Sequence, residues 1–128
     1  MKASTIEWIE KAEGDFDMAL RAYRARKRPN YDAACFHAQQ CIEKYLKARL
    51  NEAGIVIQKT HNLVDLLNDV LPAEPTWATL HITLATLTKY AVLYRYPGYD
   101  ATKLEAKTAI KDCRNVRRII RTVFGLPV

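Results

Sequence analysis

Apolar residues recur at helical spacing along most of the chain and predict a series of amphipathic helices. The first is expected to begin near Thr5, because Ser4 and Glu7 form a capping-box pattern, and to end before Pro29. Its predicted buried face consists of Trp8, Ile9, Ala12, Phe16, Ala19, Leu20 and Tyr23.

A second helix is predicted from Tyr31 to Ala53, where Gly54 supplies a stop signal. Its predicted core face consists of Tyr31, Ala34, Cys35, Ala38, Cys41, Ile42, Tyr45 and Ala48. Alanine and cysteine dominate the first half of that face. Because small side chains let a neighbouring helix approach closely, this helix is expected to lie at the centre of a bundle.

Three further helices complete the pattern: a short one in NLVDLLNDVL, a long one from near Thr76 to the segment YRYPGYD, and a last one from about Ala101 to Phe124. The first of the two long helices has an apolar face of Trp77, Leu80, Leu84, Leu87, Ala91 and Tyr94. The last helix is expected to bury Ala106, Ala109, Cys113, Val116, Ile120, Val123 and Phe124. No strand pattern is present. The predicted fold is all-α, an antiparallel bundle of four long helices and one short helix in a single domain, residues 1–128.

Composition narrows the class of protein. No apolar run approaches the roughly 18 residues of a membrane span, and the acidic N-terminal segment is unlike a secretion signal. The odd number of cysteines, all within helical patterns, favours reduced core residues over disulfides, and so a cytoplasmic protein. The net charge of +6 points to an acidic partner.

A polar strip borders the apolar face of the second helix. It consists of His37, Gln40, Lys44 and Lys47, which fall within an arc of about 80°. An imidazole, an amide and two cations on one groove would suit a phosphate or a nucleotide edge. Alternatively, His37 and Gln40 hydrogen-bond to a neighbouring helix while the lysines are solvated. Both interpretations are open on the residues alone.

Two other segments carry candidate binding residues. In YRYPGYD, Arg95 either caps the last carbonyls of its helix or binds a phosphate through its guanidinium, with Tyr96 and Tyr99 available to stack on a base. A basic stripe on the last helix consists of Lys103, Lys107, Lys111, Arg114, Arg117, Arg118 and Arg121, within an arc of about 120°. Such a stripe is either a solvated face or a surface for RNA, DNA or an acidic protein.

Several kinds of active site are absent from the sequence. The three histidines, His37, His61 and His81, lie on separate elements, and no HExxH or Glu-x-x-His pair is present to hold a metal. Neither GxxxxGK[ST] nor GxGxxG occurs. Cys35 and His37 are two residues apart on a helix and therefore point away from each other. We expect no metal and no cofactor.

The segment ACFHAQQCIEKYLKARL, followed by KTHNL and DLL, then YRYPG and a long basic helix, resembles the HEPN family, named for its occurrence in higher eukaryotes and prokaryotes. The resemblance extends from about Ile6 to Phe124. It implies a bundle of four to five helices, commonly a homodimer with a cleft between protomers. HEPN proteins are often encoded beside minimal nucleotidyltransferases, as in toxin–antitoxin pairs, and many are metal-independent endoribonucleases.

The chain departs from the ribonuclease members of that family at one motif. Those members carry an arginine followed, after four to six intervening residues, by a histidine, and toxins paired with nucleotidyltransferases add a tyrosine two positions later. Arg95 matches the arginine, but the histidine positions are Asp100, Ala101 and Thr102, and the tyrosine position after Asp100 is Thr102. The usual proton-transfer partner is therefore missing.

The leading hypothesis is a binding module for a nucleotide, a nucleic acid or a cognate nucleotidyltransferase. Its expected ligand-binding residues are His37, Gln40, Lys44, Lys47, Lys59, His61, Arg95 and Tyr96. The alternative is an endoribonuclease toxin with an altered active site, in which His37 or His61 replaces the missing histidine. A third interpretation is a dimerising subunit with no small ligand.

Overall fold

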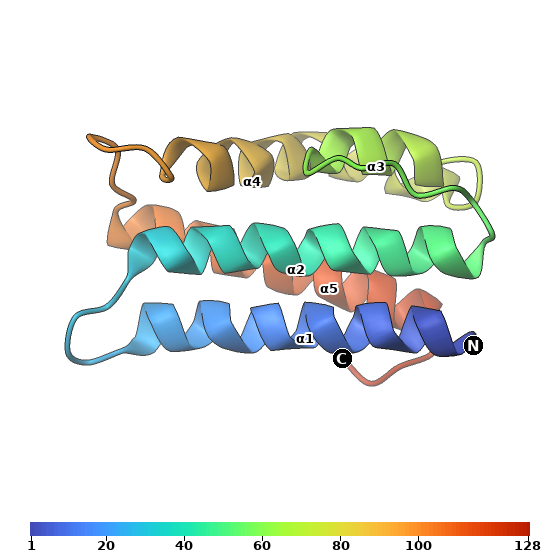
Figure 1. Cartoon of the computed structure of the whole chain (residues 1–128), viewed down its shortest axis with the longest axis horizontal. Coiled ribbons are helices and arrows are strands. Elements are labelled where there is room, and N and C mark those ends of the chain that lie inside the picture. The colour runs from blue at the N-terminus through green and yellow to red at the C-terminus, as the bar shows by residue number, and fades with distance from the viewer.

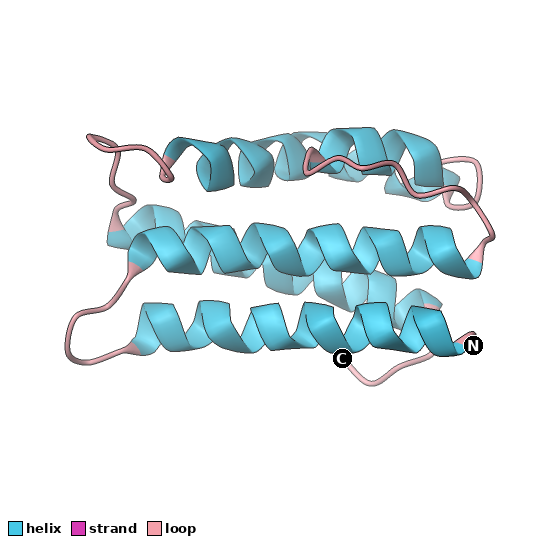
Figure 2. Cartoon of the chain, in the orientation of Figure 1, coloured by secondary structure: helices cyan, strands magenta, loops and turns pink.

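Five α-helices and one 3₁₀ turn make up the protein, described here by a computed structural model of all 128 residues (Figures 1 and 2). The elements are α1 (Ala3–Arg24), α2 (Tyr31–Glu52), α3 (Leu63–Val70), the 3₁₀ turn η1 (Pro75–Leu80), α4 (His81–Leu93) and α5 (Lys103–Val123). No strand is present. This arrangement confirms the prediction of an all-α bundle.

Helix α2 is the central element. It packs against all four other α-helices: α1 lies on one side of it, α3 and α4 on the other, and α5 behind it (Figure 1). In the same view α1 runs antiparallel to α2, whereas α5 runs in the direction of α2. Ala34, Cys35, Ala38 and Cys41 are completely buried, so their small side chains do allow close approach of neighbouring helices.

The N-terminus of α1 differs from the sequence prediction. The helix begins at Ala3, after Lys2, and no side chain caps it. Ser4 lies inside the helix, where its hydroxyl accepts a hydrogen bond of 2.8 Å from Asn51 of α2. Lys2 donates its backbone N–H to Glu52 at 3.0 Å and its ammonium to the Asn51 carbonyl at 2.8 Å. The predicted Ser4–Glu7 capping box is therefore wrong, because contacts with the end of α2 fix this terminus.

The other helix ends follow local sequence signals. The Asn30 side chain accepts a hydrogen bond of 2.9 Å from the Ala33 N–H and so caps α2, which stops before Gly54 at a φ of 72°. Thr102 and Glu105 form the capping box of α5. The helix predicted from near Thr76 begins instead as the 3₁₀ turn η1 and becomes α-helical only at His81.

All three cysteines are free thiols within the core. Burial raises the pKa of Cys35 to about 12, and the neighbouring charges of Glu105 and Asp32 contribute to the rise. None of the helices combines the length and apolar character that crossing a lipid bilayer requires.

Candidate functional site

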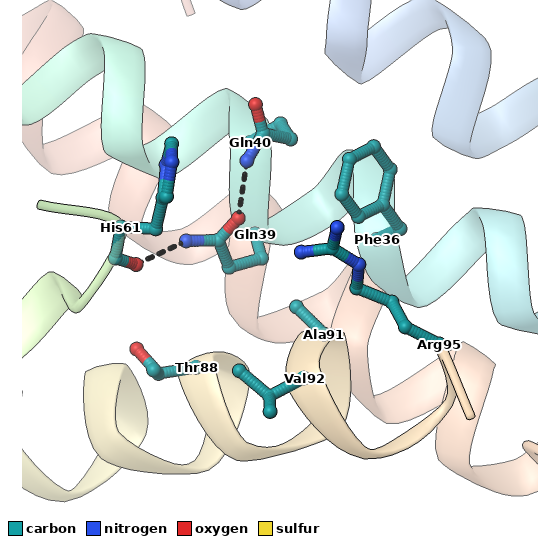
Figure 3. Close-up of a pocket in the computed structure, with 8 residues that line it drawn as sticks. All are labelled: Phe36, Gln39, Gln40, His61, Thr88, Ala91, Val92 and Arg95. Carbon is teal, nitrogen blue, oxygen red and sulfur yellow. Dashed lines mark hydrogen bonds between the residues drawn. The ribbon is translucent and has the colours of Figure 1, made fainter. Parts of the chain in front are cut away.

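A small pocket lies between α2 and α4, and Figure 3 shows the eight side chains around it. They are Phe36, Gln39 and Gln40 of α2, His61 of the linker before α3, Thr88, Ala91 and Val92 of α4, and Arg95 of the turn after α4. The cavity measures about 180 Å³. Three residues that the sequence singled out separately, Gln40, His61 and Arg95, therefore meet at one place.

Arg95 supplies the only permanent cation of the pocket lining. It is exposed, and its backbone N–H donates to the Val92 carbonyl at 3.3 Å. Its guanidinium has no ion pair, and Figure 3 shows it reaching from the end of α4 toward Phe36 and Gln39 of α2. The side chain therefore does not cap the last carbonyls of α4. An unpaired, planar guanidinium at the mouth of a pocket is suited to bind an anion in a bidentate fashion.

Two neighbouring amides form one wall. Gln40 Nε2 donates to Gln39 Oε1 at 2.8 Å, and Gln39 Nε2 donates to the His61 carbonyl at 2.8 Å. Gln39 is almost completely buried, with 2% of its surface exposed. Its amide therefore holds the linker, residues 53–62, against α2 and sets the position of His61.

Glu43 accepts hydrogen bonds of 3.4 Å from both of these amides and was not among the residues predicted from the sequence. Its carboxylate is buried, and Oε1 lies 3.0 Å from His61 Nδ1 while Oε2 accepts a hydrogen bond of 3.1 Å from Lys47 Nζ. The Glu43 side chain is 4% exposed, whereas that of His61 is 81% exposed. Because a carboxylate can only accept, Nδ1 of His61 donates to it, which leaves Nε2 as the acceptor of the imidazole whenever the ring is neutral.

The polar strip of α2 is divided between two surroundings. His37 and Lys44 lie outside the pocket lining and both bind Asp15 of α1, His37 Nδ1 at 2.8 Å from one carboxylate oxygen and Lys44 Nζ at the other. Asp15 is 8% exposed. Lys47 is paired with Glu43, and its Nζ lies 5.7 Å from the centre of the Trp8 ring. Of the four strip residues, only Gln40 lines the pocket.

The remaining predicted site residues lie at the surface. Lys59, Tyr96 and Tyr99 are exposed and do not line the pocket. Two of the three positions at which the ribonuclease motif would have a histidine make structural contacts here: the Ala101 N–H donates to Asp32 at 2.7 Å, and the Thr102 hydroxyl accepts from the Glu105 N–H at 3.1 Å. The first contact ties the start of α5 to α2, and the second caps α5.

The basic stripe of α5 is also divided. Arg117 binds Glu13 of α1 through two hydrogen bonds of 2.7 and 2.6 Å and lies 4.6 Å from the centre of the Phe16 ring. Arg121 donates to the Tyr45 hydroxyl at 3.0 Å and approaches Glu13 at 3.5 Å. By contrast, the other five residues of the stripe have no ion pair. Arg114 is half-buried, and the other four are exposed: Lys103, Lys107, Lys111 and Arg118. No three His, Cys, Asp or Glu side chains are arranged to hold a metal ion.

Two solved structures and one further protein are similar to this chain. The crystal structure of TT1696 from Thermus thermophilus is similar with a TM-score of 0.82 and 24% identity, over 94% of this chain and 98% of that one. The crystal structure of ST0689, an archaeal HEPN homologue, is similar with a TM-score of 0.73 and 26% identity, over 95% and 98% of the two chains. The Methanocaldococcus jannaschii protein named "Putative toxin MJ1304" is 27% identical over 131 residues, which cover 89% of this chain and 84% of that protein.

The family model described as the HEPN domain matches residues 5–123, which is nearly the whole chain. This range agrees with the extent of the resemblance seen in the sequence motifs. The helical order and the similarity to the HEPN homologue ST0689 agree with it as well. The chain belongs to the HEPN domain family.

Proposed function

We propose that this HEPN protein is a nucleotide- or RNA-binding member of a toxin–antitoxin pair, and that the pocket between α2 and α4 holds a phosphate of the ligand. The observation that carries the proposal is the unpaired guanidinium of Arg95 facing the amides of Gln39 and Gln40 across the pocket. The guanidinium provides a charge and several N–H donors for phosphate oxygens. The N–H groups of both amides already donate within the protein, so the amides line the pocket and Arg95 supplies the donors.

The dimensions of the pocket favour a phosphate over an enclosed nucleotide. Its 180 Å³ is smaller than the roughly 300–1,000 Å³ of pockets that bury whole small molecules. A nucleotide or an RNA strand would therefore place one phosphate beside Arg95 and leave its bases at the surface, where Tyr96 and Tyr99 are 62% and 52% exposed. Aromatic rings in that position can stack on bases.

The toxin–antitoxin context is supported by the similarity to the Methanocaldococcus jannaschii protein whose name describes a toxin. The HEPN resemblance adds a minimal nucleotidyltransferase as the expected cognate partner and a homodimer as the expected assembly. Both belong to the proposal. Co-purification with the product of an adjacent nucleotidyltransferase gene would test the partner, and light scattering of the pure protein would test the homodimer.

The binding site is tested by measuring the affinity of a labelled single-stranded RNA and of a labelled nucleotide. We expect affinity to fall steeply with salt and Arg95→Ala to weaken binding about tenfold or more, because a hydrogen-bonded charge pair is lost. Arg95→Lys should have an intermediate effect, since it keeps the charge without the planar fork. Lys89→Ala, at an exposed position of α4, is the matched control. Equal affinity of the Arg95→Ala and Lys89→Ala variants would contradict the site.

A second function, metal-independent cleavage of RNA, is favoured by the contact between His61 and Glu43. Nε2 of His61 would take the proton of a ribose 2′-hydroxyl while the 2′-oxygen attacks the phosphorus. The bond between the phosphorus and the 5′-oxygen would then break, and the 5′-oxygen would take a proton from water. Arg95 would neutralise the phosphate. Of the two histidines considered as replacements, His61 lines the same pocket as Arg95, whereas His37 lies against Asp15 of α1.

Prolonged incubation of pure protein with RNA in the presence of a chelator distinguishes this second function from binding alone. Cleavage that is lost in His61→Gln but retained in His81→Gln, an exposed histidine at the start of α4, would support it. Intact RNA after incubation with the wild-type protein would exclude it and leave the binding function standing.

A further inference from the structure

A second groove lies on a different face of the bundle, between the C-terminal half of α1 and the N-terminal half of α5. It is an open hollow of about 460 Å³. On α1 it is lined at positions 20, 23 and 24, and on α5 at positions that include 104, 107, 108 and 111. These are helical spacings on both sides, so the groove runs along the two helix axes.

The floor of the groove is apolar. Leu20 is half-buried, Ile110 is 5% exposed, and Leu104 at the start of α5 is 70% exposed. Tyr23 is the one aromatic residue of the lining, and its ring packs against Tyr31 with the ring centres 6.0 Å apart. Leu104 therefore presents apolar surface to solvent beside a hollow that no part of this chain fills.

Four cations surround this floor: Arg24 of α1 and Lys107, Lys111 and Arg114 of α5. No acidic side chain lines the groove, and none of the four has an ion pair. Farther along the same helix, Arg117 and Arg121 are both engaged by Glu13. Glu13 thus offsets part of the positive charge of α5 near its C-terminal end, whereas no carboxylate pairs with the cations at the groove.

We propose that this groove, here called the α1/α5 groove, is a docking site for an acidic amphipathic helix of a partner protein. The lined stretch of α5 from position 104 to position 114 is about 15 Å long, which is roughly three turns of a docked helix. Apolar side chains of that helix would cover Leu104, and its carboxylates would meet Lys107, Lys111 and Arg114.

RNA fits this surface less well than an acidic helix does. Phosphates would be attracted by the four cations, but they offer nothing to cover Leu104. The ring of Tyr23 lies against Tyr31, so it is not a free stacking platform. The apolar floor and the four surrounding cations together match a partner that carries both apolar and acidic groups. The proposal concerns a different face from the Arg95 pocket and does not depend on the function of that pocket.

The test uses the full-length protein labelled with ¹⁵N and a synthetic acidic peptide of about 15 residues, with leucines at helical spacing and glutamates between them. A scrambled peptide of the same composition lacks the apolar face. We expect the amphipathic peptide, and not the scrambled one, to shift the amide signals of residues lining the α1/α5 groove. Absence of such shifts at millimolar peptide, or equal shifts with the scrambled peptide, would overturn the proposal.

Variants at exposed positions separate the two components of the surface. Leu104→Ser should weaken peptide binding about tenfold or more, and the double variant Lys107→Glu, Lys111→Glu should abolish it. The matched controls are Ile82→Ser and Lys89→Glu, which change an exposed apolar residue and an exposed lysine of α4. Circular dichroism checks that every variant is folded. Equal weakening by the controls, or shifts at the groove produced by a single-stranded RNA and not by the peptide, would also overturn the proposal.

Discussion

Glu13 of α1 is held by Arg117 of α5 through two parallel hydrogen bonds, Nε to Oε2 at 2.7 Å and Nη2 to Oε1 at 2.6 Å. The Tyr45 hydroxyl of α2 donates to the same carboxylate at 2.5 Å, so one acidic side chain joins three helices. Arg117 belongs to the basic stripe of the sequence. Its role in the structure is therefore to fasten α5 to α1 and α2, and the contact has a consequence for acid stability.

We expect the Glu13 contact to stabilise the fold above about pH 4.5 and to be lost in acid. Burial raises the pKa of Glu13, but hydrogen bonds from Arg117 and Tyr45 and the charges of Arg117 and Arg121 outweigh it and hold the pKa below its ordinary value of 4.5. A lowered folded-state pKa means that the stabilisation is complete above the unfolded-state value and disappears as the pH falls through the folded-state value.

The measurement is the free energy of unfolding in urea as a function of pH for the wild type and Glu13→Gln. At neutral pH the variant should be less stable by about 1–3 kcal/mol, since the Arg117 guanidinium loses its charged partner. The difference should shrink below pH 4.5. Glu10→Gln, at an exposed position of the same helix, should follow the wild-type curve. A constant difference between wild type and Glu13→Gln across this range would contradict the prediction.

Asp15 should matter more for stability than its neighbour Asp17. Both oxygens of Asp15 are engaged, by His37 and Lys44 of α2, and the side chain is 11% exposed. Asp15→Asn should therefore lower the free energy of unfolding by about 1–3 kcal/mol, because it leaves the partly buried Lys44 ammonium without a full charge partner. Asp17→Asn is the control: its pair with Arg21 is 57% and 75% exposed and should be worth less than about 1 kcal/mol. Similar losses in both variants would contradict a structural role for Asp15.

The three cysteines should be unreactive in the native protein. All three thiols lie in the core. Burial is the largest cause that raises the pKa of Cys35 to about 12. Burial is also the largest cause that raises the pKa of Cys41 well above its ordinary value. Because the thiolate is the reactive form, we expect no rapid modification by Ellman's reagent at pH 8. The same protein in guanidinium chloride should release three equivalents, one for each cysteine of the sequence. Rapid native modification of even one thiol would contradict the burial of these side chains.

The fold was predictable from the sequence to a large extent because its signals are local. The period of apolar residues located α2, and its run of small side chains indicated its central position. Gly54 and Pro29 marked ends that the structure confirms. The predicted start of α1 is wrong, because contacts with Asn51 and Glu52 fix Lys2 and Ser4. These contacts join residues 47 to 50 positions apart, so no local pattern reveals them.

The candidate site was predictable only in part. Arg95, Gln40 and His61 each stood out as polar groups in family motifs, and the structure brings them to one pocket. Gln39 and Glu43 were missed, because a buried polar residue and a solvated one look alike in sequence. The signal that could have found Glu43 is its spacing of four residues from Lys47, which on a helix forms an ion pair.

The pair formed by Glu43 and His61 should respond asymmetrically to substitution. Glu43 is 4% exposed and also binds Lys47, so Glu43→Gln leaves Lys47 without a charged partner in a buried setting and should lower the free energy of unfolding by about 1–3 kcal/mol. His61 is 81% exposed, so His61→Gln should cost less than about 1 kcal/mol. Urea unfolding measures both values. Equal losses would mean that the imidazole is a structural element. A small loss at His61 would mean that Glu43 orients a side chain on which the fold does not depend, which is the arrangement expected of a group that acts on a ligand.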